Sequence, residues 1–151
     1  MKTLILVRHA QALSCIAAGV PSDELRPLSG EGRQKAAATA LRLQALSLHP
    51  ARILTSPLLR ARQTAEILSR TFTCPVDTAE ELDGFHPDKD VRDFLCNQLE
   101  NTDVLLAVGH NPNISCVNHL LCGQMHAFRP GSFAVLNMEN GKVPQFIVFG
   151  E

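Results

Sequence analysis

The sequence lacks an excess of charge of either sign. Lysine and arginine together number 14, aspartate and glutamate number 15, and the formal net charge at pH 7 is −1. Such a balanced chain has no long-range attraction for nucleic acid or for an anionic membrane surface, so neither is expected as a partner. Any anion that the protein binds must be held by a local arrangement of side chains.

The cysteines lack the spacing of a disulfide framework or of a metal site. There are five, and no two of them form a C-x-x-C pair: Cys15, Cys74, Cys96, Cys116 and Cys122. An odd number at loose spacing is typical of reduced thiols in a cytosolic protein. We expect these small side chains to fill space in the core, and no metal ligand set is predicted.

Long hydrophobic runs are also missing. The first apolar run covers only residues 4–7, whereas the core of a signal peptide needs roughly 7–15 residues. No segment approaches the ~20 apolar residues of a membrane span. A cytoplasmic location is therefore expected. With 151 residues and 45% hydrophobic composition, the chain is predicted to form a single domain over residues 1–151.

Short apolar runs alternate with segments of helical periodicity. Buried strands are predicted over residues 4–7, 52–54 and 104–108, and helices over residues 32–48, 58–72, 90–99 and 114–122. Two later strands, at residues 133–138 and 145–149, are expected to join through a hairpin turn at Asn140-Gly141. Residues 15–28 lack periodicity and predict a long loop. The pattern indicates an α/β fold: a three-layer α/β/α sandwich with a mostly parallel central sheet and a C-terminal antiparallel ribbon.

Polar residues follow all three predicted parallel strands. Arg8-His9 follow the first, Ser56-Pro57 the second and His110-Asn111-Pro112 the third. Serine and asparagine before proline are typical of helix N-termini, where free N–H groups and the helix dipole favour an anion. Because ligands of open α/β sheets bind at the carboxyl ends of the strands, these residues predict a site for an anion, and phosphate is the ligand expected.

The arginines of the second predicted helix differ in the face they occupy. An apolar stripe at helical spacing faces the core: Leu58, Ala61, Ala65, Leu68 and Phe72. Arg62 belongs to a ladder of charged residues on the opposite, solvent face. Arg60 lies in the first turn, on the edge that it shares with Thr64. We interpret Arg62 as structural and Arg60 as a phosphate ligand, because a guanidinium binds phosphate oxygens bidentately.

These residues amount to a family resemblance. The stretches LVRHAQA, SPLLRARQTAE and VGHNPN, in this order, resemble the three signatures of the histidine phosphatase superfamily. The stretch LRPLSGEG and the short chain resemble its SixA-type phosphohistidine phosphatase branch. Ala10 stands where the family pattern usually has glycine, as it often does in SixA-like chains. The resemblance implies a phosphoglycerate-mutase-like fold and one histidine phosphatase domain.

The resemblance also implies roles for the residues at the strand ends. His9 would be the nucleophile that forms a phosphohistidine enzyme intermediate, and Arg8, Arg60 and His110 would surround the phosphoryl oxygens. One ring nitrogen of His9 must be unprotonated, so the other needs a fixed acceptor, expected to be a backbone carbonyl of the following loop. No metal or other cofactor is implied.

The identity of a general acid stays open. Members of the family that act on phosphate esters use a carboxylic acid in the segment that corresponds to ELDGFHPDKD. Glu81 is the first choice and Asp83 the second, although neither falls in a clean family motif. Glu80 and Asp88 lie nearby.

The other arginine and histidines near these motifs are expected to have lesser roles. Arg26 is interpreted as an anchor of its loop, and a peripheral role for His86 is left open. The remaining histidines are expected to be loop or surface residues without a role: His49, His119 and His126.

Three functions are compatible with these sequence features. The first is a phosphatase whose partner is a phosphohistidine-bearing protein, such as a component of a phosphorelay. The second is a small-molecule phosphomonoesterase or a mutase-like relative, and the third is a non-catalytic module that binds phosphate or another oxyanion. Imidazole, with a reference pKa near 6.5, leaves with little help, whereas an alkoxide needs a positioned acid. Because the chain is short and offers no well-matched acid, the first function is favoured.

Overall fold

A six-stranded sheet forms the centre of the computed structural model, which describes residues 2–139 and 143–151. The strands are β1 (Thr3–Arg8), β2 (Arg52–Thr55), β3 (Val76–Thr78), β4 (Val104–Gly109), β5 (Phe133–Asn137) and β6 (Gln145–Gly150), in the spatial order β3-β2-β4-β1-β5-β6. The first four in that order run parallel, and β5 and β6 continue the sheet as an antiparallel pair. The predicted mixed sheet is confirmed.

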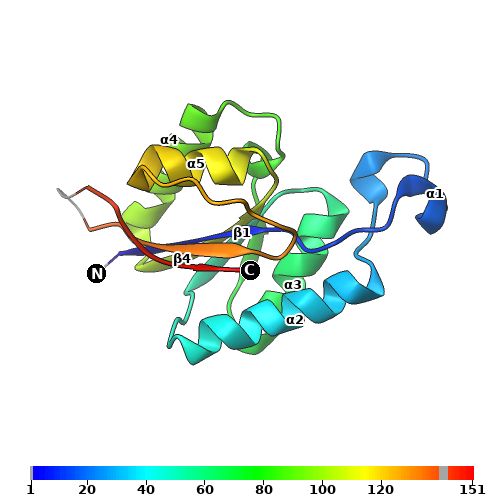
Figure 1. Cartoon of the computed structure of the whole chain (residues 1–151), viewed down its shortest axis with the longest axis horizontal. Helices are drawn as coiled ribbons and strands as arrows, with labels where there is room; N and C mark the ends of the chain where they lie inside the picture. Colours follow the sequence, from blue (N-terminus) through cyan, green and yellow to red (C-terminus); the bar gives the residue numbers. More distant parts are fainter. Residues whose placement is uncertain (1, 140–142) are drawn as a thin grey trace.

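Helices cover both faces of the sheet (Figure 1). On one face lie α2 (Gly30–Ala45) and α3 (Leu59–Phe72), and on the other lie α4 (Asp88–Gln98) and α5 (Asn113–Cys122). Side chains alternate along β1, so that Leu4 and Leu6 join the core under α4 and α5, whereas Ile5 and Val7 join the core under α2 and α3. The α/β/α layers follow from this two-sided burial.

The segment predicted as an irregular loop contains two short elements. A single-turn helix, α1 (Cys15–Ala18), and a 3-10 turn, η1 (Asp23–Leu25), lie within residues 15–28. The side chain of Ser14 accepts a hydrogen bond from the N–H of Ala17, and Gly19 ends the turn at a φ of 67°. One capped turn is too short to produce a periodic pattern, which explains why the sequence did not reveal it.

The remaining differences from the predicted secondary structure are small. Strand β3 was missed because it has three residues and pairs only with β2, at the edge of the sheet. Two further 3-10 turns, η2 (Glu80–Leu82) and η3 (Leu99–Asn101), flank α4. The expected turn at Asn140-Gly141 falls outside the described residues, although β5 and β6 pair antiparallel as expected.

The cysteines are only partly core residues. All five are free and half-buried, and three of them pack against the two main core clusters: Cys74, Cys96 and Cys122. In residues 2–139 and 143–151, no cluster of three or more histidine, cysteine, aspartate or glutamate side chains could hold a metal ion. No helix in the same described ranges is long and apolar enough to span a membrane.

The N-terminus of α2 packs directly on the segment that follows β1. The Ser29 side chain accepts a hydrogen bond from the N–H of Gly32 at 3.0 Å, and the N–H of Ser29 donates to the carbonyl of Gln11 at 3.0 Å. A Cβ atom on Gly32 would lie 2.0 Å from that carbonyl oxygen. Only glycine allows this close approach, which explains the glycine at the end of the RPLSGEG stretch.

We therefore predict that Gly32→Ala destabilises the protein, by about 1–3 kcal/mol, because backbone atoms rather than a flexible side chain must move. Gly30→Ala, two residues earlier in the same helical turn, meets nothing within 4 Å. It should leave the free energy of unfolding unchanged or raise it slightly. Urea denaturation of the two variants is the measurement, and equal losses in both would contradict the packing described.

Candidate active site

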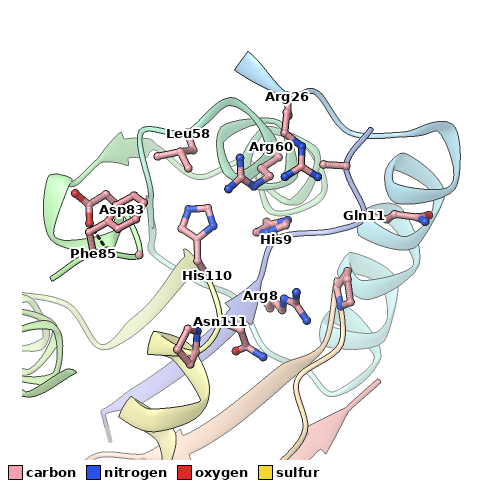
Figure 2. A pocket seen from close by; sticks show the side chains of 14 residues that line it. Arg8, His9, Gln11, Arg26, Leu58, Arg60, Asp83, Phe85, His110 and Asn111 are labelled. Carbon is pink, nitrogen blue, oxygen red and sulfur yellow. Dashed lines mark hydrogen bonds between the residues drawn. The ribbon is translucent and has the colours of Figure 1, made fainter. Parts of the chain in front are cut away.

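A cavity of about 510 Å³ opens at the carboxyl ends of the parallel strands (Figure 2). Its lining includes all four residues that the sequence predicted to meet there: Arg8, His9, Arg60 and His110. Parallel pairing explains the convergence, because β4 lies between β1 and β2 and all three strands end at this edge.

His9 is held in one tautomer by the backbone. Its Nδ1 lies 2.7 Å from the carbonyl oxygen of Ala10, an atom that can only accept. The proton therefore resides on Nδ1, and Nε2 keeps its lone pair. Burial lowers the pKa of His9 to about 4, against the opposing effect of the Ala10 carbonyl and with help from the charges of Arg60 and Arg8. The ring is neutral at pH 7. Its hydrogen-bond acceptor is a backbone carbonyl of the following loop, as expected from the sequence.

Thr64 fixes the peptide that holds His9. Its Oγ1 accepts a hydrogen bond from the N–H of Ala10 at 3.1 Å and donates to the carbonyl of Arg60 at 2.8 Å. The side chain is buried. The Thr64 hydroxyl thus joins the loop that follows His9 to the first turn of α3. Helical periodicity alone did not predict this link.

Arg60 and Arg62 lie on the two different faces of α3 that helical periodicity predicted. Arg60 is 8% exposed and lines the cavity, whereas Arg62 is exposed on the opposite face. Arg60 donates from Nη1 to the carbonyl of Asp23 at 2.9 Å and from Nη2 to its carboxylate at 3.0 Å. Among the described residues, these contacts use two of the five guanidinium N–H groups of Arg60.

Arg26 both anchors its loop and lines the cavity. Its Nε donates to the carbonyl of Leu13 at 2.8 Å, and its Nη1 donates to the Asp23 carboxylate at 3.0 Å. The hydrogen bond from Arg26, followed by the charge of Arg60, holds the pKa of Asp23 below its usual value. Asp23 therefore bridges two cavity arginines as a carboxylate.

Arg8 is oriented by a single carbonyl. Its Nη1 donates to the oxygen of Phe128 at 2.8 Å, and Asn111 donates to the same oxygen at 3.0 Å. The Nε of Arg8 is buried and has no hydrogen-bond partner among the described residues. The guanidinium is thus positioned but incompletely satisfied.

His110 is paired with a serine. Its Nε2 lies 2.7 Å from Oγ of Ser56, whose oxygen also accepts from the N–H of Leu58. Burial lowers the pKa of His110 to about 3. The ring therefore stays neutral beside His9, with 5.0 Å between the two ring centroids.

The predicted N-caps are wrong. Helix α3 begins at Leu59 and α5 at Asn113, so Ser56 and Asn111 each lie too early to cap the helix that follows. Ser56 instead orients His110, and Asn111 accepts from Ser115 and helps to hold the Phe128 carbonyl.

The two candidate acids occupy different places. Asp83 lines the cavity, whereas Glu81 is not among its lining residues, so geometry reverses the order of preference. Asp83 accepts from the N–H of Phe85 at 2.8 Å and lies 3.0 Å from Nδ1 of His86. Burial raises its pKa, but these hydrogen bonds outweigh that effect and leave the pKa below its usual value. The same contact raises the pKa of His86.

The remaining candidates lie outside this cavity. Asp88 accepts from Asn113, and Glu80 lines a separate hollow. His119 and His49 are exposed, whereas His126 is half-buried and stacks on Phe146 and Phe149, with ring centroids 4.6 and 4.7 Å away. His126 therefore lies in a loop, as expected, and contributes to packing there.

The resulting arrangement is a neutral imidazole in a cavity with three arginines. A lone pair on Nε2 of His9 is a nucleophile, and guanidinium groups stabilise the charge of a phosphoryl group as it is transferred. The described part of the chain offers no metal-binding cluster to share that task.

Sequence comparison identifies the family of the chain. The profile of the histidine phosphatase superfamily (branch 1) matches residues 4–90. An uncharacterized protein of Picosynechococcus sp. is 39% identical over 116 residues, which make up 74% of this chain and 67% of the relative. The chain belongs to the histidine phosphatase superfamily.

Solved structures share the fold. The protein histidine phosphatase SixA, in a complex with tungstate, superposes with a TM-score of 0.88 at 24% identity, covering 98% of this chain and 96% of that one. The alpha-ribazole phosphatase of Shigella flexneri superposes with a TM-score of 0.77 at 19% identity, covering 99% and 96%. At these identities the likeness establishes the phosphoglycerate-mutase-like fold.

The depressed pKa values of His9 and His110 predict how stability depends on pH. In the unfolded chain both rings take up protons near pH 6.5, whereas in the folded protein they do so only near 4 and 3. The unfolded state therefore binds more protons between these values, and stability falls as the pH drops from about 6.5 to about 4. Each histidine contributes a slope approaching about 1.4 kcal/mol per pH unit.

Urea denaturation between pH 5 and 6.5 measures this slope. His110→Asn should reduce it, whereas the exposed His119→Asn, on α5, serves as the matched control. An unchanged slope in the His110→Asn protein would show that the ring is not buried in its neutral form.

Proposed function

We propose that this protein is a phosphatase that removes the phosphoryl group from phosphohistidine on a protein substrate, with His9 as the nucleophile. The observation that carries the proposal is the hydrogen bond between Nδ1 of His9 and the Ala10 carbonyl, 2.7 Å long, in a cavity lined by three arginines. It leaves a nucleophilic nitrogen free at neutral pH. A module that only bound phosphate would have no need of it.

The reaction proceeds in two steps. Nε2 of His9 attacks phosphorus, the new N–P bond forms, and the bond from phosphorus to the substrate imidazole breaks. The substrate ring takes a proton from the solvent on its other nitrogen, so it departs as neutral imidazole, and the second step returns that proton to the solvent. A water molecule then attacks the phosphorus of phosphorylated His9, which releases inorganic phosphate and restores the neutral ring. Arg8, Arg60 and His110 surround the phosphoryl oxygens in both steps, and Arg26, which also lines the cavity, adds a further positive charge.

The state of Asp83 supports phosphohistidine as the substrate. Its carboxylate is engaged by Phe85 and His86, and its pKa lies below the usual value, so it is a poor proton donor at neutral pH. An alkoxide leaving group would lose the roughly 10²–10⁴-fold assistance of a general acid, whereas imidazole leaves without it. The structural likeness to SixA agrees with this choice, and a cytoplasmic phosphorelay protein is the partner proposed.

A second function, hydrolysis of a small phosphate ester, is favoured by two observations. The fold is shared with an alpha-ribazole phosphatase, and Asp83 is the carboxyl group placed to serve such a reaction.

A substrate panel distinguishes the two functions. Turnover is compared for phosphotransfer proteins phosphorylated on histidine, phosphoramidate, p-nitrophenyl phosphate, a sugar phosphate and phosphoglycerate. We expect kcat/KM to be highest for a phosphohistidine protein, and Asp83→Asn to lower that value only mildly. Faster hydrolysis of an alkyl phosphate, abolished by Asp83→Asn, would establish the second function instead.

The nucleophile is tested by rapid-quench experiments with labelled substrate. His9→Ala should trap no phosphoryl group and should lose several orders of magnitude in turnover.

Two arginines of α3 provide a matched test of the phosphate site. Arg60→Ala should lower kcat/KM at least 100-fold, on the order of 3 kcal/mol for one lost contact to the transition state. Arg62→Ala, two residues away and exposed, should change it less than twofold. Equal losses in steady-state kinetics would mean that the effect comes from the helix and not from the cavity.

A further inference from the structure

The rim of the active-site cavity carries an exposed aromatic side chain. Phe85 is 84% exposed, yet it lines the cavity, across from Gln11 in Figure 2. An aromatic side chain that is buried typically removes 150–250 Å² of surface from water. At this exposed position the ring of Phe85 makes no such contribution to the core. Its apolar surface is available at the place where a substrate enters.

The backbone presents Phe85 in a fixed position. The N–H of Phe85 donates to the Asp83 carboxylate, which His86 also contacts. Gly84 has a φ of 95°, and a Cβ on it would lie 3.2 Å from Cβ of His110. The loop is thus braced against a residue of the site. A ring on such a loop loses little backbone freedom when it is covered.

The surroundings of Phe85 limit what can lie beside it. Together with Leu58 and Asp83, the ring also lines a neighbouring hollow of about 220 Å³, where Glu24 and Glu80 contribute further carboxyl groups. These carboxylates repel a second anionic group on a substrate, such as that of a glycerate or a bisphosphate. The part of the substrate that passes Phe85 is therefore apolar or cationic, which suits a polypeptide surface.

We propose that Phe85 packs against the protein surface around the phosphohistidine and so determines affinity for a protein substrate. The inference rests on the proposed function and adds a specificity-determining residue to it. Because the ring lies at the rim, beyond the reacting nitrogen and the guanidinium groups, it acts on binding of the partner and not on transfer of the phosphoryl group. Substrates without a protein surface do not use it.

The experiment compares two substrates that both have a P–N bond. One is the phosphohistidine protein turned over fastest in the panel, and the other is phosphoramidate, which has no surface to cover Phe85. Phe85→Ser should raise KM for the protein about tenfold at nearly constant kcat, and should change KM for phosphoramidate less than twofold. Phe85→Leu, which keeps an apolar side chain, should recover most of the affinity.

Leu41→Ala is the matched control, because Leu41 is 62% exposed on α2 and does not line the cavity. It should leave both substrates unaffected. Equal effects of Phe85→Ser on both substrates, or no effect on the protein substrate, would overturn the inference while the proposed function stands. If the wild-type enzyme turned over no phosphohistidine protein, the proposed function would fail, and the inference with it.

Discussion

The active site depends on the in-register parallel pairing of β1 with β4. In this register Arg8 lies beside Gly109, and the N–H of His9 donates to the Gly109 carbonyl at 3.0 Å. The next residues on the two strands, His9 and His110, therefore emerge side by side at the same edge. A shift of one residue in either strand would send its side chains to the opposite face of the sheet. All other groups of the site are arranged around this pair.

Burial at this edge explains the protonation states of the two histidines, and the positive charge of the arginines adds to its effect. Arg8, Arg26 and Arg60 line one cavity, and burial there disfavours any further charge. Both imidazoles respond by remaining neutral, with pKa values near 4 and 3. Burial, aided by the charges of Arg60 and Arg8, thus leaves His9 with the unprotonated nitrogen that the proposed covalent mechanism requires.

The sequence predicted those parts of the site that follow from local geometry. Arg60 could be assigned because helical periodicity separates its face from the solvent face, and His110 because it follows a buried strand. The serine that orients His110, Ser56, could not, since the contact joins two strands. Asp83, and not Glu81, lines the cavity, on a loop in which Gly84 has a positive φ and packs against His110. Such turns leave no periodic signal.

Asp23 supplies a counter-ion to two arginines of the cavity. Its carboxylate bridges Arg26 and Arg60, so one negative charge partly offsets their two positive charges. Inorganic phosphate, the dianionic product, then gains less from binding than it would beside bare guanidinium groups. Interactions of equal strength in ground and transition states do not accelerate catalysis, and a tightly held product slows it. The internal carboxylate therefore favours release over retention and keeps the enzyme turning over.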